Sequence, residues 1–350
     1  MELAKLISIM NVVGSVRLTS TKKMNLQKVF IQGLIFIATS AQSATIQPPH
    51  KVYISKIADH PALDATTNGI VAALEIKGYK QGKNLDLRIE SAQGNPALAQ
   101  QIAAKYSNQN PAVVVGVGTV TAQSFAKHAA SKKVKLVFSS ITDPLKSGLV
   151  QTITAPNNNT SGVSNYIDLL PQLELFKKLQ PSLKKLGFLY NPGEANSVIL
   201  KEKLEELCPQ LDLILICQAV NKTADVAQNA TKLAQNSQAI FISNDSTALS
   251  SLQSVIKAAT RAKIPVYVSD TDAVALGAVA ALGPNQYEIG LQTGYMIARL
   301  LNGGDIAVEQ IELPHKTDLY LNVDAAARIG IIIPEELTKL ATKVIGGANS

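Results

Sequence analysis

Polar side chains able to hold a small molecule recur directly after apolar, strand-like runs in this 350-residue chain. Asp59-His60 follows VYISKIA, Asp143 follows LVFSSIT, and Asn191 follows GFLY. Each is followed by a proline, which suits the first turn of a helix, and the free N–H groups of a helix start attract a carboxylate or another anion. The same Asp and Asn side chains can instead cap the helix. Capping and anion binding compete for the same donors, so not every loop can do both.

A glycine-bearing loop, Gly116-Val-Gly118-Thr119-Val120-Thr121, begins like a dinucleotide-binding fingerprint, but Thr121 stands where the third glycine would be. A GxG alone is weak evidence for a nucleotide. We expect the glycines to let the backbone approach a ligand and the two threonine hydroxyls to donate to a carboxylate. The alternative is a simple tight turn from strand to helix.

Carboxylates are concentrated at two further loop tips, Asn244-Asp245-Ser246-Thr247 and Ser269-Asp270-Thr271-Asp272. In a closed, dehydrated cleft such groups favour an ammonium group or sugar hydroxyls. We expect one of these aspartates to be a helix cap and another to meet a cation, with Asp272 and Asp245 as the preferred candidates. The choice between the two loops stays open.

Signatures of catalysis and of metal binding are missing from the sequence. It contains no Walker A motif, no GxSxG and no HExxH, and none of the four histidines has metal-ligand spacing to another His or Cys. His60 alone lies at a predicted loop tip, where an exposed helix-start histidine is the alternative to a ligand contact. We therefore predict no enzyme activity, no cofactor and no metal, although a Ser–His–Asp set assembled only in three dimensions is left open.

Six strand–loop–helix repeats must position these loops. Parallel strands need helical crossovers, and ligands collect at their carboxyl ends. The pattern predicts an α/β fold of two doubly wound parallel-sheet lobes, divided by PNNNTSGVSN (156–165). The expected strands are 51–57, 84–91, 112–117, 134–139, 184–190, 211–217, 238–243, 265–268 and 278–283. The expected helices are 61–77, 96–109, 121–131, 170–179, 195–207, 223–235, 246–262 and 287–302, before a tail with extended pieces at 308–314 and 319–324 and a helix near 334–345.

The charge distribution argues against a nucleic-acid partner. The net charge is +7, of which +4 falls in residues 1–44, leaving +3 for the rest of the chain. No basic run and no alternation of aromatic and basic residues occurs. Hydrophobic residues make up 46% of the chain, which is ample for a core in each lobe.

The amino end has the pattern of a secretory signal. A short basic segment ending at Lys28 precedes the apolar run VFIQGLIFIA (29–38) and the small residues TSAQSA (39–44). We expect export to the periplasm with cleavage near residue 43; Met24 is an alternative start. Cys208 and Cys217 would then lie in an oxidising compartment, where two buried free thiols are the preferred interpretation and a disulfide is left open.

Several segments together resemble the ABC-transporter substrate-binding family that includes tryptophan-binding proteins. They are ISKIADHPALDATTNGIVAALEIKGYKQGKNLDLRIESAQGNPALAQQIA, FSSITDPLKSGLV, GVSNYIDLLPQLELFKKL, FLYNPGEANS and YVSDTDAV, and the similarity spans residues 50–345. It implies a type I periplasmic-binding-protein fold, with two lobes, three crossings and a ligand trapped by hinge closure. Two departures affect the ligand: GTVTAQ stands where Thr-Pro-Ala is frequent, and Gly193 where Ser is usual.

The resemblance also implies a division into lobes and a set of ligand-binding residues. We expect a signal segment at 1–44, a first lobe at 45–162 plus 276–312, and a second lobe at 163–275 plus 313–350. Strand 278–283 and helix 287–302 would return to the first lobe. The implied first-lobe contacts are Asp59, His60, Thr119, Val120, Thr121, Thr142 and Asp143. The implied second-lobe contacts are Asn191, Glu194, Asn196, Ser197, Asn244, Asp245, Ser246, Asp270, Thr271 and Asp272, with Asn285 after the returning strand.

The sequence thus predicts an exported, monomeric solute-binding protein that captures a small polar ligand between two lobes. The expected ligand is an amino acid, with an aromatic one as an option. The expected partner is an ABC permease in the inner membrane. A periplasmic ligand-sensing subunit for a membrane receptor and a secreted enzyme are the alternatives.

Overall fold

The structure, a computed structural model, describes residues 48–154, 159–166, 168–315 and 317–347. The expected signal segment, its cleavage point and Met24 lie outside these residues. Among the described residues, none of the helices combines the length and the apolarity needed to cross a membrane.

The first sheet has the strand order β2-β1-β3-β4-β5, and every pairing in it is parallel. Buried, uninterrupted apolar runs such as VVVGV in β3 are typical of such sheets, which are covered on both faces. Its elements are β1 (His50–Lys56), α3 (Pro61–Ile76), β2 (Leu85–Ser91), α4 (Pro96–Ser107), β3 (Val113–Val117), α5 (Thr119–Lys132), β4 (Lys135–Ile141), β5 (Thr160–Ser164) and the later helix α11 (Gln286–Leu301). We call this group the first lobe.

The second sheet has the order β12-β11-β10-β9-β8-β6-β7, and only the β10–β11 pair is antiparallel. Its strands are β6 (Lys185–Tyr190), β7 (Ile214–Ala219), β8 (Ala239–Ile242), β9 (Val266–Val268), β10 (Ala280–Pro284), β11 (Thr317–Asn322) and β12 (Lys343–Ile345). Its helices are α6 (Leu169–Leu179), α7 (Ala195–Leu207), α8 (Val226–Asn236), α9 (Ser246–Ser250), α10 (Leu252–Arg261), α12 (Val323–Arg328) and α13 (Glu335–Leu340), with 3₁₀ turns including η3 (Thr271–Leu276). This group is the second lobe.

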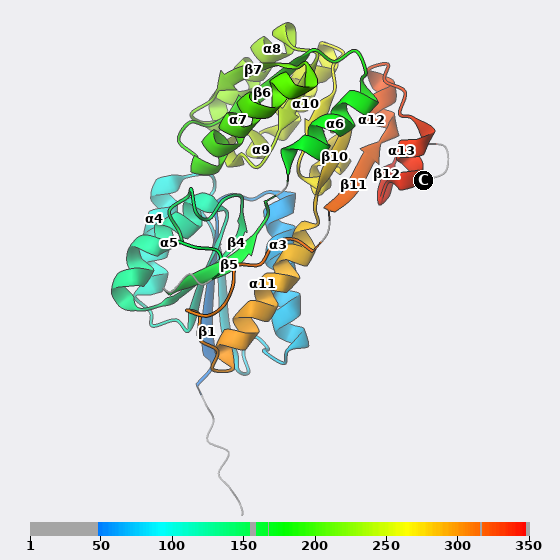
Figure 1. The fold of residues 1–350 in the computed structure, drawn as a ribbon. Helices are drawn as coiled ribbons and strands as arrows, with labels where there is room; N and C mark the ends of the chain where they lie inside the picture. The colour runs from blue at the N-terminus through cyan, green and yellow to red at the C-terminus, as the bar shows by residue number, and fades with distance from the viewer. Residues whose placement is uncertain (1–47, 155–158, 167, 316, 348–350) are drawn as a thin grey trace, which may run out of the picture. The chain divides into compact units, whose positions relative to one another are not determined.

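Each sheet is the middle layer of a three-layer sandwich. In β1, Val52 and Ile54 pack towards α3 and α11, whereas Tyr53 packs towards α4 and α5. In the second lobe α6 and α7 cover one face of the sheet, and α8 and α10 cover the other (Figure 1). Both sheets lie within one compact unit that begins at Pro48. The described elements change lobe three times along the chain: between β5 and α6, between β10 and α11, and between α11 and β11. The predicted α/β fold of two parallel-sheet lobes is confirmed.

The predicted return of strand 278–283 to the first lobe is wrong. The strand found there, β10, pairs with β9 and β11 in the second sheet, and the chain changes lobe only after it. A short run of small residues fits either sheet, so its composition could not decide. The predicted boundary at residue 162 is also displaced, because β5 keeps the chain in the first sheet as far as Ser164. The other boundaries stay a prediction.

The remaining differences between the predicted and the observed elements lie in the connections and in the tail. The Asn-rich connection ends in the unpredicted strand β5, and the tail expected to be helical over 334–345 splits into α13 and β12. Residues 308–314 form no strand and make a single bridge from Glu312 to Val163. Cys208 and Cys217 are free thiols; Cys208 is buried, which raises its pKa to about 12.

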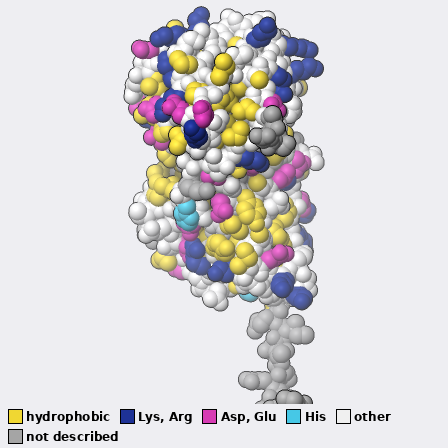
Figure 2. All heavy atoms as spheres, turned by 90° about the vertical axis from the view of Figure 1, so that its right-hand side faces the viewer, with side chains coloured by type: hydrophobic (Ala, Val, Ile, Leu, Met, Phe, Trp, Pro, Cys, Tyr) yellow, Lys and Arg dark blue, Asp and Glu magenta, His cyan; other side chains and the backbone are white. Residues whose placement is uncertain are grey.

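Apolar side chains reach the surface over both lobes on the face shown in Figure 2, interspersed with acidic and basic ones. Exposed large apolar residues include Ile76 in the first lobe and Ile332 and Leu340 in the C-terminal segment. Scattered exposed residues of this kind are normal on a soluble surface and indicate no partner by themselves.

Helices α3 and α11 touch through glycine. A Cβ placed on Gly290 of α11 would collide with the carbonyl oxygen of Thr66 in α3, and one on Gly69 would collide with the carbonyl oxygen of Tyr287. The helices lie side by side in Figure 1, and this close approach holds their N-terminal turns at a fixed separation. Those turns begin beside His60 and at Gln286.

We predict that Gly290→Ala lowers the free energy of unfolding by about 1–3 kcal/mol, because a methyl group at a backbone–backbone contact forces the two helices apart. The measurement is urea unfolding followed by circular dichroism. Glu288→Ala, an exposed position on the same helix, is the matched control and should change stability far less. An unchanged unfolding midpoint for Gly290→Ala would contradict the packing described.

Candidate functional site

Loops from both lobes surround a narrow cavity, which we call the inner cavity. Its free space is about 40 Å³, room for a few water molecules. The first lobe lines it with Ala58, His60, Ala62, Leu63, Gly118, Thr119, Ser140, Thr142, Asn165 and Gln286. The second lobe lines it with Asn196, Asn244, Ser246, Leu249 and Asp270.

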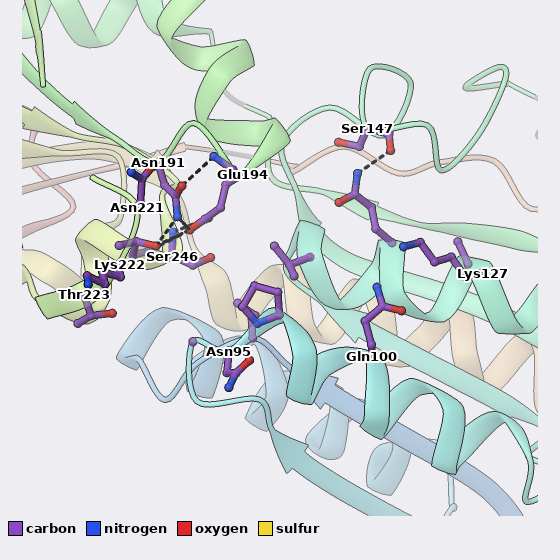
Figure 3. A pocket seen from close by; sticks show the side chains of 18 of the residues that line it. Asn95, Gln100, Lys127, Ser147, Asn191, Glu194, Asn221, Lys222, Thr223 and Ser246 are labelled. Atoms are coloured by element: carbon purple, nitrogen blue, oxygen red, sulfur yellow. Dashed lines mark hydrogen bonds between the residues drawn. The ribbon is translucent and has the colours of Figure 1, made fainter. Parts of the chain in front are cut away.

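A larger groove of about 1000 Å³ adjoins the inner cavity, and Ser246 lines both. Figure 3 shows this outer groove, with Asn95, Gln100 and Lys127 from the first lobe on one side and Glu194 and Lys222 from the second on the other.

Helix α5 presents an uncapped N-terminus at the inner cavity. Its N-cap is Gly118 at φ +90°, and no described side chain caps the helix, so the first-turn N–H groups keep their positive end available. Gly116 is needed for this turn, since a Cβ there would lie 2.6 Å from the amide nitrogen of Ala122. The predicted hydroxyl donation by Thr121 is wrong: its Oγ1 donates back to the carbonyl oxygens of Val117 (2.8 Å) and Gly118 (2.9 Å). Thr119 does line the cavity.

Asp270 supplies a carboxylate oxygen that lacks a partner. Its Oδ1 accepts the N–H of Asp272 at 3.1 Å and so caps η3, but its Oδ2 has no hydrogen-bond partner among the described residues. The side chain is only 2% exposed. Burial, together with the nearby charge of Asp272, raises the pKa of Asp270 to about 7. A cationic group reaching Oδ2 would stabilise the ionised form.

His60 lies beside Asp270 in its neutral form. Its Nδ1 accepts the N–H of Ala62 at 3.2 Å as the cap of α3, so the ring proton belongs on Nε2. Burial lowers the pKa of His60 to about 4. Because the ring is neutral, the 3.6 Å contact between Nδ1 and Oδ2 of Asp270 is not an ion pair, and it is too long for a hydrogen bond. The Nε2 donor has no partner among the described residues.

Two asparagines extend the second-lobe side of the inner cavity. Asn196 donates from Nδ2 to the carbonyl oxygen of Asn244, while its buried Oδ1 lacks a partner within the described part of the chain. Asn244 in turn donates to Thr142 Oγ1 at 3.4 Å, a long hydrogen bond that joins the two lobes. Acceptor atoms without partners thus border the cavity at both Asp270 and Asn196.

Two other predicted second-lobe carboxylates, Glu194 and Asp245, serve as structural caps. Glu194 accepts the N–H groups of Ser246 (2.9 Å) and Thr247 (3.1 Å). Asp245 accepts from Ala248 N (2.7 Å), Asn191 N (2.6 Å) and Ser197 Oγ (2.5 Å). Burial, and then the neighbouring Glu194, raise the pKa of Asp245 to about 7. With both oxygens engaged, Asp245 is not the free carboxylate that the sequence favoured.

The predicted contacts divide between the inner cavity, the outer groove and positions that line neither. Among them, His60, Thr119, Thr142, Asn196, Asn244, Ser246 and Asp270 line the inner cavity. Val120, Asn191 and Glu194 line the outer groove. Thr121, Ser197, Asp245, Thr271, Asp272, Asp59, Asp143 and Asn285 line neither.

Local hydrogen bonds and one ion pair explain why some of these side chains line neither the inner cavity nor the outer groove. The carboxylate of Asp59 is 64% exposed and 2.9 Å from Lys56 Nζ, because the ion pair turns it outwards. Asp143 caps its own turn by accepting the N–H groups of Leu145 and Lys146. Asn285 caps α11 through the N–H of Glu288 at 3.1 Å. Capping, the alternative considered from the sequence, explains Asp143 and Asn285.

Sequence reasoning missed seven lining residues, of which Ser140, Asn165 and Gln286 are polar, Leu63 and Leu249 are large and apolar, and Ala58 and Ala62 are small. Gly118, expected from the sequence to let the backbone approach a ligand, also lines the cavity. Leu63 and Leu249 come from opposite lobes. Apolar residues one turn into a helix look like core from the sequence, so no local signal marked them. Among the described residues no group of three His, Cys, Asp or Glu side chains could hold a metal ion.

We predict that Asp270→Asn stabilises the ligand-free protein at about pH 8. In the fold Asp270 keeps its proton up to about pH 7, whereas an unfolded chain releases it near pH 4. The folded state therefore binds more protons in this window, and wild-type stability falls as pH rises through it. The gain should shrink towards about pH 4.5.

Urea unfolding of both proteins at the two pH values is the measurement. Asp245 titrates in both and cancels from the difference. Asn196→Ala, which removes a neutral side chain from the same cavity, is the control and should show the same stability change at both pH values. An Asp270→Asn effect that does not vary with pH would refute the buried-charge account.

Known proteins resemble this chain over most of its length. The family model described as "ABC transporter substrate binding protein" matches residues 51–345. A tyrosine-binding protein of Clostridioides difficile (strain R20291) is 31% identical over 274 residues, which cover 77% of this chain and 78% of the relative.

Two solved structures bear on the arrangement of the lobes. An ABC domain from Streptococcus pneumonia in complex with L-Trp is 28% identical with a TM-score of 0.82, over 85% of this chain and 100% of that one. The ligand-free, open structure of a substrate-binding protein with adhesive properties from Clostridium difficile is 29% identical with a TM-score of 0.64, over the same shares. The fold is that of the type I periplasmic binding proteins, and the chain belongs to the ABC transporter substrate-binding protein family.

Proposed function

We propose that this protein is exported, binds an amino acid in the inner cavity, and delivers it to the permease of an ABC importer. The observation that carries the proposal is the pairing of two opposite subsites at one cavity. The uncapped N-terminus of α5 offers N–H donors to a carboxylate, and the unpartnered Oδ2 of Asp270 offers an acceptor to an ammonium group. A zwitterion satisfies both at once.

The apolar part of the cavity supports an amino acid with a large apolar side chain. Leu63 and Leu249 line it from opposite lobes. Ala58 and Ala62, which line it from the first lobe, have small side chains that leave room for a ligand. A relative that binds tyrosine and a neighbour solved with L-Trp support an aromatic ligand. Flat rings can lie between two aliphatic side chains without aromatic stacking, since their burial alone is favourable.

Closure of the two lobes around the ligand is the proposed mechanism. About 40 Å³ is too little for an amino acid, so the lobes must separate to admit one. At nearly equal identity, the chain superposes better on the L-Trp complex than on the open, ligand-free structure, which supports a closed arrangement here. A ligand that contacts both lobes favours the closed form by its differential affinity. Relatives described as substrate-binding proteins support a role without turnover.

We predict that L-tyrosine or L-tryptophan raises the melting temperature of the mature protein, whereas tyramine and 3-(4-hydroxyphenyl)propionate, which lack one charged end each, raise it far less. A ligand at about 1,000 times its Kd stabilises the fold by about 4 kcal/mol. Thermal unfolding with each compound is the measurement, and native mass spectrometry of protein purified from periplasm would identify a co-purified ligand. If none of the common amino acids raises the melting temperature, the amino-acid assignment is rejected.

Delivery to a permease requires a separate test. Deleting the gene should abolish uptake of the radiolabelled amino acid identified above, and a plasmid copy should restore it. A plasmid copy with Asp270→Asn should restore it poorly, because the ammonium subsite is lost. Normal uptake in the deletion strain would argue for the sensing role.

A further inference from the structure

Gln286 lies at the first position of α11, directly after the chain leaves β10 of the second sheet. The residue is 3% exposed and lines the inner cavity. Its Oε1 accepts from Ser140 Oγ at 2.9 Å and lies 3.2 Å from Thr66 Oγ1. The amide oxygen therefore lies against two hydroxyls, that of Ser140 in β4 and that of Thr66 in α3, the second of which also lies 3.0 Å from the carbonyl oxygen of Ala62.

Ser140 occupies a strained backbone position that serves this contact. Its φ is +58°, in the left-handed region that non-glycine residues avoid, and the register between β4 and β5 shifts between Ser139 and Ile141. A bulge of this kind turns a side chain away from the ordinary alternation of a strand. Here it directs the hydroxyl to Gln286, and such strain persists where the surrounding structure requires it.

Because the hydroxyls occupy Oε1, the Nε2 donors of Gln286 are left for the cavity. No hydrogen bond from Nε2 to another described residue is formed, although the residue is almost fully buried. An acceptor atom of a ligand in the cavity can therefore bond to this donor. We infer that Gln286 binds the carboxylate of the amino-acid ligand through Nε2 and is positioned for this by Ser140 and Thr66, an inference that rests on the function proposed above.

The distribution of unsatisfied groups gives this contact a wider role. The first lobe brings donors to the cavity: the α5 amides, the buried Nε2 of His60, and Nε2 of Gln286, whose Oε1 alone is engaged. The second lobe brings acceptors: Oδ2 of Asp270 and Oδ1 of Asn196. A zwitterion therefore joins the lobes with its carboxylate on one side and its ammonium on the other. Through Gln286 the carboxylate is hydrogen-bonded to α11, the helix that begins at a crossing between the lobes.

The isosteric change Gln286→Glu tests the inference. A carboxylate keeps an acceptor for the Ser140 hydroxyl but replaces the donor that faces the cavity with a negatively charged acceptor. Isothermal titration would compare L-tyrosine and L-tryptophan with tyramine and tryptamine, which lack the carboxylate. We expect Gln286→Glu to weaken binding of the two amino acids by about 100-fold and Gln286→Ala by about tenfold, and neither to weaken binding of the amines.

Two further variants separate binding from structure. Ser140→Gly removes the orienting hydroxyl and relieves the left-handed strain, so it should weaken amino-acid binding while leaving the melting temperature equal or higher. Gln292→Ala, on the same helix but hydrogen-bonded to Glu312 and Leu313 outside the cavity, should leave every Kd unchanged.

The outcomes distinguish this inference from the proposed function. If the wild type binds L-tyrosine or L-tryptophan and Gln286→Glu, folded by its melting temperature, binds them equally well, the role of Gln286 is refuted and the amino-acid function stands. An equal loss for amino acids and amines would also refute it, since that pattern indicates a distorted cavity. A wild type that binds no amino acid would refute the proposed function itself.

Discussion

The close contact between α3 and α11 is the constraint on which the cavity depends. Gly69 and Gly290 allow the helices to meet backbone to backbone, so their N-terminal turns cannot shift independently. The turn that starts α3 carries His60, and the turn that starts α11 carries Gln286. Because α11 begins where the chain has just left β10, the same contact also fixes one of the lobe crossings against the first lobe.

Unsatisfied polar groups at the inner cavity are costly in the protein alone, and this cost points to function. A buried carboxylate oxygen without a partner, as at Asp270, is disfavoured unless the group keeps its proton or meets a cation. Donors from one lobe and acceptors from the other cannot satisfy each other across the gap. Under the proposed function, a ligand with a separate positive and negative end would satisfy both, and its contacts with both lobes would favour the closed form.

Residues near the cavity differ in whether they are available to a ligand, and hydrogen bonding decides this. Asp245 and Glu194 have buried carboxylates like Asp270, but backbone N–H groups and hydroxyls take up their oxygens. Thr121 lies two residues from Thr119, yet its hydroxyl donates to the carbonyl oxygen of Val117 at the end of the preceding strand. Loop-tip position therefore led to residues that line the inner cavity, but it did not show which side chains keep unpaired polar atoms.

The sequence by itself determined the α/β class, most helices and strands, and the loops that meet at the site, because apolar periodicity, Pro at helix starts and Gly at turns act over a few residues. Only the tertiary structure decided that β10 belongs to the second sheet, that Asp270 and not Asp245 keeps a buried oxygen without a partner, and that Ser140 and Gln286 reach the cavity. Strand pairing, and the competition for hydrogen bonds inside a buried site, depend on residues distant in the chain, so no local pattern could reveal them.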